Sequence, residues 1–202
     1  FVNSIDAENH HVSATQSSDA ITYKYNKLIV ATGALPKVAA LQGFSFNDTQ
    51  ENNSKIHVLH TMADYLSLDT ELEHAQKAAI IGAGYIGIEM AEAMARRKLD
   101  VTLYQRSDEI LSTVENEFGA MAHQALTKNQ VTVLTDRNIL SVVSSATDVK
   151  IKTTDLDNNT DEQQFDTVLV VTGVQPNTQL LKEAGAKIGV AGAISVDEFM
   201  HT

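Results

Sequence analysis

Three glycines in this chain have the spacing G-x-G-x-x-G, which is typical of a turn that binds a dinucleotide. Gly82, Gly84 and Gly87 stand between an apolar run and a segment with helical spacing. In such a turn the first glycine permits a tight reversal, the second lets the pyrophosphate approach the backbone, and the third lets the helix pack closely on the strand. Free N–H groups and the dipole at the start of the helix favour a phosphate there. The pattern predicts an NAD(P) site made by Ile81, Gly82, Ala83, Gly84, Tyr85, Ile86 and Gly87, and the alternative is a glycine-rich turn without a ligand.

The end of the next apolar run indicates which dinucleotide binds. The run from Val101 to Tyr104 ends on Gln105 and Arg106. Turns that bind NAD usually have an acid about 20 residues on, which bonds the ribose 2′-hydroxyl. A neutral residue does not repel a 2′-phosphate, and an arginine can pair with one. We therefore expect NADPH to be favoured over NADH.

Two further side chains on the helix after the glycines have the spacing of a shared face. Tyr85 and Glu89 are four residues apart, so both project from one side of the helix within its first two turns. They could lie beside the cofactor. The alternatives are core packing for Tyr85 and a favourable contact with the helix dipole for Glu89.

The elements expected around these residues alternate between strand and helix, which implies a parallel sheet. Strands are expected at Ala78–Ile81, Val101–Tyr104 and Val131–Leu134, with helices at Tyr85–Arg97 and Glu115–Asn129 between them. Three further strand-like runs follow, at Ile139–Ser144, Val149–Thr154 and Thr167–Val171, around an acidic turn. A helix capped by Thr61 is expected over Thr61–His74.

The two ends of the chain have shorter and less regular patterns. Strands are expected at Phe1–Ile5, His11–Thr15, Ile21–Tyr25 and Leu28–Ala31, and loop and strand at Ile188–Val196. A polar segment from Leu41 to Lys55 is the best candidate for a linker.

Composition excludes several classes of function. The chain has 202 residues, of which 43% are hydrophobic, and a formal net charge of −11. No basic patch is visible, so a nucleic-acid partner is not expected. The absence of cysteine rules out disulphides and thiolate chemistry within these residues. No apolar run is long enough to span a membrane, and a cytoplasmic location is expected. Because the chain starts at Phe1, it is interpreted as an internal fragment.

Two patterns resemble metal sites only weakly, and no metal is expected. The acidic run "DLDNNTDE" from residue 155 has alternating carboxylates, but it lacks the glycine and closing glutamate of a calcium loop. A solvated hairpin turn is the favoured interpretation. His57 and His60 form an H-x-x-H pair without further ligands.

Four separated motifs together resemble the pyridine nucleotide-disulphide oxidoreductases, flavoproteins with one FAD domain and one inserted NAD(P) domain. "YKYNKLIVATGALPK" resembles the second FAD motif, and "IIGAGYIGIEMAE" resembles the NAD(P) motif. "FDTVLVVTGVQPNT" is similar to the return crossing, and "GAISVDEFMHT" to the strand before the final FAD motif. The motifs occur in the family's order and cover nearly the whole chain.

The resemblance implies an α/β fold and a role for each matched residue. The expected architecture is a Rossmann-like NAD(P) domain, with a parallel sheet and a β-meander, flanked by partial FAD-domain β segments. The implied segments are 1–45 (partial FAD domain), 46–76 (linker and helix), 77–173 (NAD(P) domain) and 174–202 (return to the FAD domain). Tyr85 would gate the nicotinamide pocket, and Glu89 would lie beside nicotinamide and flavin. The remaining implied contacts are Thr172 and Gly173 with NAD(P), and Ala31, Thr32 and Gly33 with FAD.

The branch that the phrasing resembles most is that of coenzyme A-disulphide reductases and the related NADH oxidases and peroxidases. It implies a parent enzyme that passes a hydride from NAD(P)H to FAD, and electrons onward to a disulphide, a peroxide or oxygen. The substrate would be a small molecule, and the parent a homodimer formed through a C-terminal domain. The first FAD glycine motif, the redox cysteine and the final Gly-Asp motif do not occur in these residues, so the 202-residue chain alone is expected to be inactive.

Some positions depart from the family pattern, and two other functions remain open. Asn26 stands where the family usually has Asp, Lys98 where a helix-ending Gly is usual, and Ser112 where NADPH-preferring members often have a second basic residue. One alternative is a flavin-dependent reductase of a ferredoxin-like or rubredoxin-like protein. The other is a non-catalytic NAD(P)-sensing domain.

Overall fold

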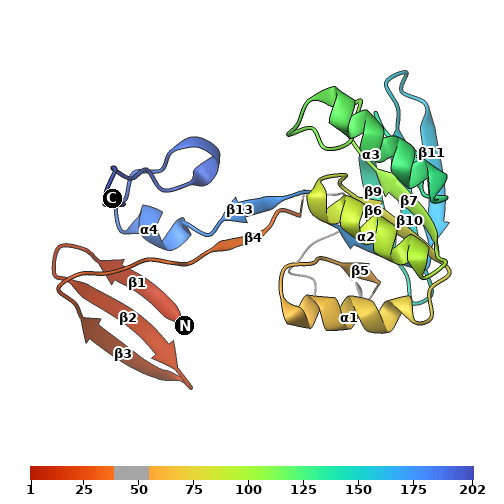
Figure 1. Ribbon diagram of the computed structural model, residues 1–202. Coiled ribbons are helices and arrows are strands. Elements are labelled where there is room, and N and C mark those ends of the chain that lie inside the picture. The colour runs from red at the N-terminus through yellow and green to blue at the C-terminus, as the bar shows by residue number, and fades with distance from the viewer. Residues whose placement is uncertain (39–54) are drawn as a thin grey trace. The chain divides into compact units, whose positions relative to one another are not determined.

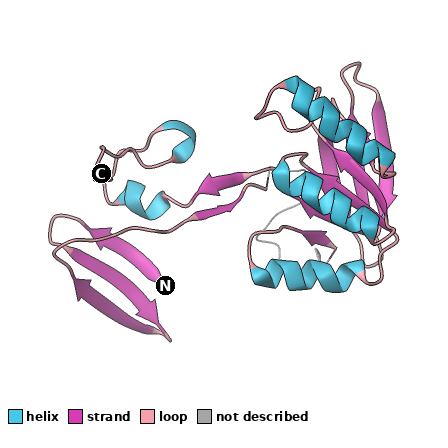
Figure 2. Ribbon diagram, viewed as in Figure 1, coloured by secondary structure: helices cyan, strands magenta, loops and turns pink. Residues whose placement is uncertain are grey.

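The computed structural model describes residues 1–38 and 55–202, which form two compact units (Figures 1 and 2). One unit combines Phe1–Leu35 with Val174–Thr202, and the other is Pro36–Gly173. Most of the predicted linker, Leu41 to Lys55, lies outside the described residues. In the part of the chain that is described, no helix is both long and apolar enough to cross a membrane.

A parallel sheet forms the centre of the second unit. Its strand order is β5-β12-β6-β7-β8, and every neighbouring pair is parallel. The strands are β5 (Ile56–His57), β12 (Thr167–Val170), β6 (Lys77–Ile81), β7 (Asp100–Tyr104) and β8 (Thr132–Leu134). The nearly continuous apolar runs of β6, β7 and β12 are those of strands covered on both faces. The strand–helix alternation predicted from the sequence is therefore confirmed.

Helices cover one face of this sheet. They are α1 (Met62–Leu72), α2 (Tyr85–Arg96) and α3 (Asn116–Lys128). Side chains of Ile80 and Leu103 pack with Met94 and Leu126 of the helices in one buried cluster. The predicted cap of α1 is present as a capping box, in which Asp64 N–H donates to Thr61 Oγ1 and Thr61 N–H donates to Asp64 Oδ2.

An antiparallel three-stranded meander covers the other face of the parallel sheet. It consists of β9 (Asn138–Ser144), β10 (Val149–Thr154) and β11 (Thr160–Phe165), in the order β11-β10-β9. Alternate residues of the parallel strands, such as Ile81 and Tyr104, point to this side because strand side chains alternate between faces. Tyr104 packs edge-to-face on Phe165, with 6.2 Å between the ring centroids. Burial raises the pKa of the Tyr104 hydroxyl to about 12, so it stays neutral.

The sequence pattern missed β11 because its residues are mostly polar and exposed, as suits an edge strand of the meander. The hairpin turn before it was predicted correctly. There the Asp155 carboxylate accepts hydrogen bonds from Asp157 N–H and from the N–H and side-chain amide of Asn159. Its acceptor capacity is thus used by the turn itself.

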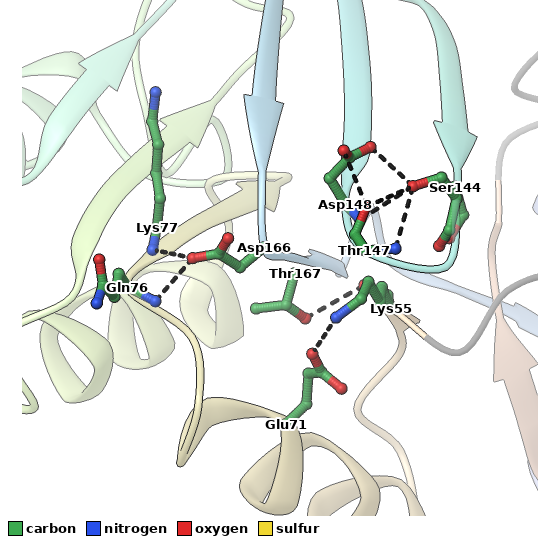
Figure 3. A network of polar contacts seen from close by, with 10 residues as sticks. Lys55, Glu71, Gln76, Lys77, Ser144, Thr147, Asp148, Asp166 and Thr167 are labelled. Atoms are coloured by element: carbon green, nitrogen blue, oxygen red, sulfur yellow. Dashed lines mark hydrogen bonds and ion pairs between the residues drawn. The ribbon is translucent and has the colours of Figure 1, made fainter.

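A polar network lies at the amino ends of the parallel strands (Figure 3). The Asp166 carboxylate accepts hydrogen bonds of 2.8 Å from the N–H groups of Gln76 and Lys77, and Asp166 N–H donates to Lys77 O. Lys55 and Glu71 form a mostly buried ion pair of 2.7 Å. These contacts lie at the amino ends of the parallel strands, whereas the glycine turn follows the carboxyl end of β6. They therefore stabilise the unit and are separate from the predicted nucleotide site.

The first unit contains an antiparallel sheet and a short paired ribbon. The sheet is β1 (Val2–Asp6), β2 (His11–Gln16) and β3 (Asp19–Lys24), and the ribbon pairs β4 (Ala34–Pro36) with β13 (Val174–Pro176). The strand predicted at Leu28–Ala31 is wrong, since these residues pair with no strand in the described part and Ile29 is 90% exposed. An apolar run needs a neighbouring strand to satisfy its backbone groups.

The end of the first unit also differs from the sequence pattern. A short helix, α4 (Gln179–Glu183), was not predicted. The expected strand in Ile188–Val196 is reduced to an isolated bridge between Ile188 and Ile194, around a 3₁₀ turn at Val190–Gly192.

His57 occupies a buried position that gives the second unit a pH-dependent stability. The side chain on β5 is 7% exposed, and its Nε2 has no hydrogen-bond partner among the described residues. Burial lowers the pKa of His57 below its ordinary value of 6.5, against the smaller opposite effect of Glu71. Because the unfolded chain binds the proton more readily, stability falls as the pH drops below about 6.5 and levels off below the folded-state pKa.

We predict that His57→Leu removes this part of the pH dependence. Between pH 7.5 and 5.5, the wild-type chain should lose more unfolding free energy than the variant, because the unfolded chain takes up a proton that the buried His57 resists. Urea unfolding at both pH values measures the difference. The control is His60→Leu, which removes an exposed histidine from the same segment of the chain. Equal losses in wild type and His57→Leu would contradict the prediction.

Candidate nucleotide-binding site

The carboxyl ends of three neighbouring strands bring most of the predicted NAD(P) residues to one edge of the sheet. Ile81 at the end of β6 is paired with Tyr104 of β7 on one side and with Val170 of β12 on the other. The chain leaves β6 toward β7 and returns to the other side of β6 as β12, so the strand order reverses beside the glycine turn. In open α/β sheets, ligands bind in the crevice at such a switch point.

Two of the three glycines are required by the protein's own packing. Gly82 has φ of +108°, and a Cβ there would lie 2.6 Å from Val171 O. At Gly87, a Cβ would overlap Gly82 O, so only glycine lets α2 begin this close to the turn. These positions agree with the sequence-based assignment of a tight reversal and a close helix–strand contact.

Gly84 is different, because nothing in the described protein explains a glycine there. Its φ of −80° is open to any residue, and a Cβ would have no atom within 4 Å. Gly84 is also the N-cap of α2, and no side chain in the described part of the chain caps this helix. An open approach to free helix N–H groups fits a phosphate of a dinucleotide. These residues therefore fit the pyrophosphate of NAD(P)H.

Ile81 and Ala83 of the predicted set have buried side chains, so only their backbone could meet a ligand. The Ile81 side chain is buried in the cluster toward the meander, and Ala83 in the cluster toward the helices. Ile81 O accepts a hydrogen bond of 2.9 Å from Val171 N–H. Ile86, by contrast, is 45% exposed on the first turn of α2.

Gln105 follows β7 and makes contacts that sequence reasoning did not anticipate. Its Oε1 accepts a hydrogen bond of 3.2 Å from Ala83 N–H, inside the glycine turn. Its Nε2 donates to Ser107 Oγ over 2.6 Å, and Ser107 Oγ donates to Glu109 O over 3.0 Å. Ser107 was missed because a single serine in a loop gives no pattern by which to select it.

Arg106 follows Gln105 in the chain and is exposed. Its guanidinium makes no ion pair with any residue that the structure describes, so it is available to an anion. Ser112 is exposed in the same loop. The loop after β7 therefore offers a cation next to the turn at Arg106, and a neutral side chain at Ser112.

Tyr85 and Glu89 lie on the exposed face of α2, as their spacing predicted. Tyr85 is 60% exposed, which excludes the alternative of core packing. Its hydroxyl accepts a hydrogen bond of 3.4 Å from Thr113 Oγ1. Glu89 is exposed and makes no hydrogen bond within the described part of the chain. Both side chains are thus exposed to a ligand, although the Tyr85 hydroxyl already has a partner in Thr113.

Thr172 and Gly173 follow β12 and are held by the chain at Lys37. Thr172 Oγ1 donates to Lys37 O, and Lys37 N–H donates to Gly173 O over 2.8 Å. Gly173 has φ of +109°, a conformation that side chains rarely adopt. These hydrogen bonds therefore hold Thr172 and Gly173 in place after β12, at the end of the sheet where β6 and β7 also finish.

The predicted FAD residues lie in the first unit and form a compact junction of their own. Thr32 Oγ1 donates to Asn177 O over 2.6 Å, and Asn177 N–H donates to Gly33 O over 3.0 Å. Gly33 has φ of +66° with open space around it, and Ala31 is exposed. Two motifs that are far apart in the sequence are thus joined by hydrogen bonds within this unit.

Comparisons with known proteins agree with this architecture. A family model described as pyridine nucleotide-disulphide oxidoreductase matches residues 2–202. The NAD(P)H sulfur oxidoreductase (CoA-dependent) of Pyrococcus furiosus is 28% identical over 199 residues, which cover 98% of this chain and 42% of the relative. The nitric oxide reductase FlRd-NAD(+) reductase of Enterobacter sp. is 31% identical over 202 residues, which cover 100% of this chain and 48% of the relative.

A solved structure gives the same result at the level of the fold. An engineered water-forming NADPH oxidase bound to NADPH, a variant of the NADH oxidase from Lactobacillus brevis, matches with a TM-score of 0.86 at 27% identity. The match covers 98% of this chain and 42% of that one. The chain therefore spans less than half the length of these relatives, and the α/β fold expected from the sequence is confirmed. By its family match and its fold, the chain belongs to the pyridine nucleotide-disulphide oxidoreductase family.

Proposed function

We propose that this chain is the NAD(P)H-binding part, with a portion of the FAD-binding part, of a flavin-dependent oxidoreductase. The observation that carries the proposal is the open, uncapped start of α2 at Gly84. It lies where the ends of β6, β7 and β12 meet, beside the exposed Arg106, Tyr85 and Glu89.

Each residue has a defined part in this proposal. The N–H groups at the start of α2 hold the pyrophosphate, and Gly84 leaves the space for it. Tyr85 and Glu89 flank the nicotinamide, and Thr172 and Gly173 line the same edge. Thr32 and Gly33 would contact the flavin within the other unit. When bound, NAD(P)H would supply a hydride and FAD would accept one.

We propose NADPH rather than NADH as the preferred dinucleotide. Arg106 makes no ion pair among the residues that the structure describes, so its cation can meet the 2′-phosphate, and Gln105 carries no charge to repel it. The engineered NADPH oxidase replaces Asp, Ala and Met at three consecutive positions with Ala, Arg and Ser. This chain reads Gln105, Arg106 and Ser107 at the end of β7, which gives an uncharged residue, an arginine and a serine in the same order.

The spacing of the other engineered positions supports this alignment. A Gly-to-Ala change lies eighteen residues before the replaced Asp, and Gly87 lies eighteen residues before Gln105. A Pro-to-Arg change lies five residues after the introduced Ser, and Ser112 lies five residues after Ser107. At these two positions this chain has Gly87, where the engineered oxidase has Ala, and Ser112, where the engineered oxidase has a second Arg. Its preference for NADPH over NADH should therefore be moderate.

The acceptor of the electrons is proposed from the relatives. A small disulphide such as coenzyme A disulphide, a peroxide or oxygen is favoured, because one relative is a CoA-dependent sulfur oxidoreductase and another is a water-forming oxidase. A protein acceptor is the second candidate. The Enterobacter relative, which is 31% identical across the chain, is named as a reductase that acts between NAD(+) and the nitric oxide reductase FlRd, which is itself a protein. A homodimeric parent stays a prediction from the family resemblance.

Isothermal titration calorimetry of the purified chain with NADPH and NADH tests the proposal. We expect saturable binding of both dinucleotides, with the lower Kd for NADPH. The absence of saturable binding for either would contradict the proposed function. A lower Kd for NADH would contradict the NADPH preference alone.

A further inference from the structure

The backbone of Ala83, at the centre of the glycine turn, forms two hydrogen bonds with the loop after β7. Its N–H donates to Gln105 Oε1 over 3.2 Å, and its carbonyl oxygen accepts from Leu111 N–H over 2.9 Å. Ala83 is 1% exposed, so water cannot easily replace either bond. A buried N–H without a partner is costly, and the Gln105 carboxamide is the group that satisfies this one.

The same carboxamide also fixes the loop that it comes from. Gln105 Nε2 donates to Ser107 Oγ over 2.6 Å, and Ser107 Oγ donates to Glu109 O over 3.0 Å. Glu109 is in turn anchored, because its Oε1 accepts from Ile110 N–H at 2.9 Å and lies 3.0 Å from His123 Nδ1 on α3. A continuous chain of bonds thus runs from the glycine turn to the helix α3.

We infer that Gln105 and Ser107 are positioning residues, which join the pyrophosphate-binding turn to the adenosine-binding loop before the nucleotide arrives. The inference rests on the proposed function, because it assigns these two segments to the two halves of one ligand. A turn and a loop that are already ordered lose less conformational freedom on binding, which increases affinity. Glutamine provides an acceptor for Ala83 N–H and a partner for the Ser107 hydroxyl on one side chain.

This role differs measurably from two simpler ones. If Gln105 matters only because it is uncharged, Gln105→Leu should change neither Kd, since leucine is also uncharged and of similar length. If Gln105 contacts the 2′-phosphate, the variant should weaken NADPH binding alone. A positioning residue acts on the shared part of the ligand, so Gln105→Leu should raise the Kd for NADPH and NADH by the same factor.

The test is calorimetric titration of the purified chain and its variants with NADPH and with NADH. We expect Gln105→Leu and Ser107→Ala each to raise both Kd values about five- to tenfold, because a loop that is no longer held before binding must lose the conformational freedom of about one residue when the ligand binds. Ser67→Ala is the matched control, because Ser67 is exposed on α1, and both Kd values should stay unchanged. Thermal unfolding followed by circular dichroism shows whether each variant is folded.

A conservative variant provides the rescue. Gln105→Glu keeps the acceptor for Ala83 N–H, and the Ser107 hydroxyl can turn to donate to it. NADH should therefore bind Gln105→Glu at least as tightly as it binds the wild type, whereas Gln105→Leu should raise the Kd for NADH about five- to tenfold. If Gln105→Leu unfolds, Ser107→Ala and Gln105→Glu carry the test.

Two kinds of failure are distinguishable. A wild-type chain that binds neither dinucleotide overturns the proposed function itself. A wild-type chain that binds, with variants that bind equally well or lose NADPH alone, overturns only the positioning role of Gln105 and Ser107.

Discussion

Replacing Gly84 with valine is expected to abolish the binding of both NADPH and NADH while the chain keeps its fold. The backbone at Gly84 has φ of −80°, which valine tolerates, and a Cβ would touch no protein atom within 4 Å. The side chain would instead fill the space that the pyrophosphate needs. We expect Kd for both dinucleotides to rise at least about a hundredfold, which corresponds to about 2.8 kcal/mol.

The other glycines of the turn provide the contrast for this variant. Gly82→Val should destabilise the fold, because φ is +108° and the new Cβ would lie 2.6 Å from Val171 O. Gly84→Val should cost about 1 kcal/mol of stability at most, since valine is a poorer N-cap than glycine. Calorimetric titration and thermal unfolding of both variants separate loss of binding from loss of fold. Undiminished binding by a folded Gly84→Val chain would mean that the turn does not hold the pyrophosphate.

Removing the guanidinium of Arg106 is expected to reduce the preference for NADPH. A charge-assisted hydrogen bond is worth about 1.5–3 kcal/mol, so Arg106→Ala should raise the Kd for NADPH about ten- to a hundredfold. The Kd for NADH should change less than about threefold, since NADH has no 2′-phosphate. Arg106→Lys should keep part of the preference, because lysine retains the charge without the planar fork.

A second arginine on the same domain serves as the control for Arg106. Arg96 is exposed at the end of α2 and pairs with Glu92 one turn earlier. Arg96→Ala should therefore leave the Kd values of both dinucleotides unchanged. Parallel losses of NADPH and NADH affinity in Arg106→Ala would show that Arg106 does not select the 2′-phosphate.

The elements that form the edge of the sheet were predictable because their signals are local. The strand before Gly82, the helix from Tyr85 and the capping box at Thr61 each follow from residues close together in sequence. The run at Leu28–Ala31 shows the limit of such signals. Its composition is that of a strand, but an apolar run becomes a strand only where another strand pairs with it.

The residues of the candidate site were predictable from the sequence, but the hydrogen bonds between them were not. Spacing identified Gly84, Gln105 and Arg106, because a strand-turn-helix unit places them at one edge. It could not show that the Gln105 side chain reaches back to Ala83 N–H, or that Ser107 completes the bridge. Those contacts depend on how the loop after β7 folds, and the sequence carries no periodic signal for it.

The central claim is that NADPH binds at the turn between β6 and α2, and a ¹⁵N–¹H NMR titration of the purified chain tests it most directly. The account predicts saturable shifts concentrated at the amide groups of Gly84, Tyr85 and Ile86, with a second group at Arg106 and Ser107. The amides of the meander strands β10 and β11, on the far side of the sheet, should stay unchanged. Saturable shifts centred on the meander, with the Gly84 amide unmoved, would contradict the account.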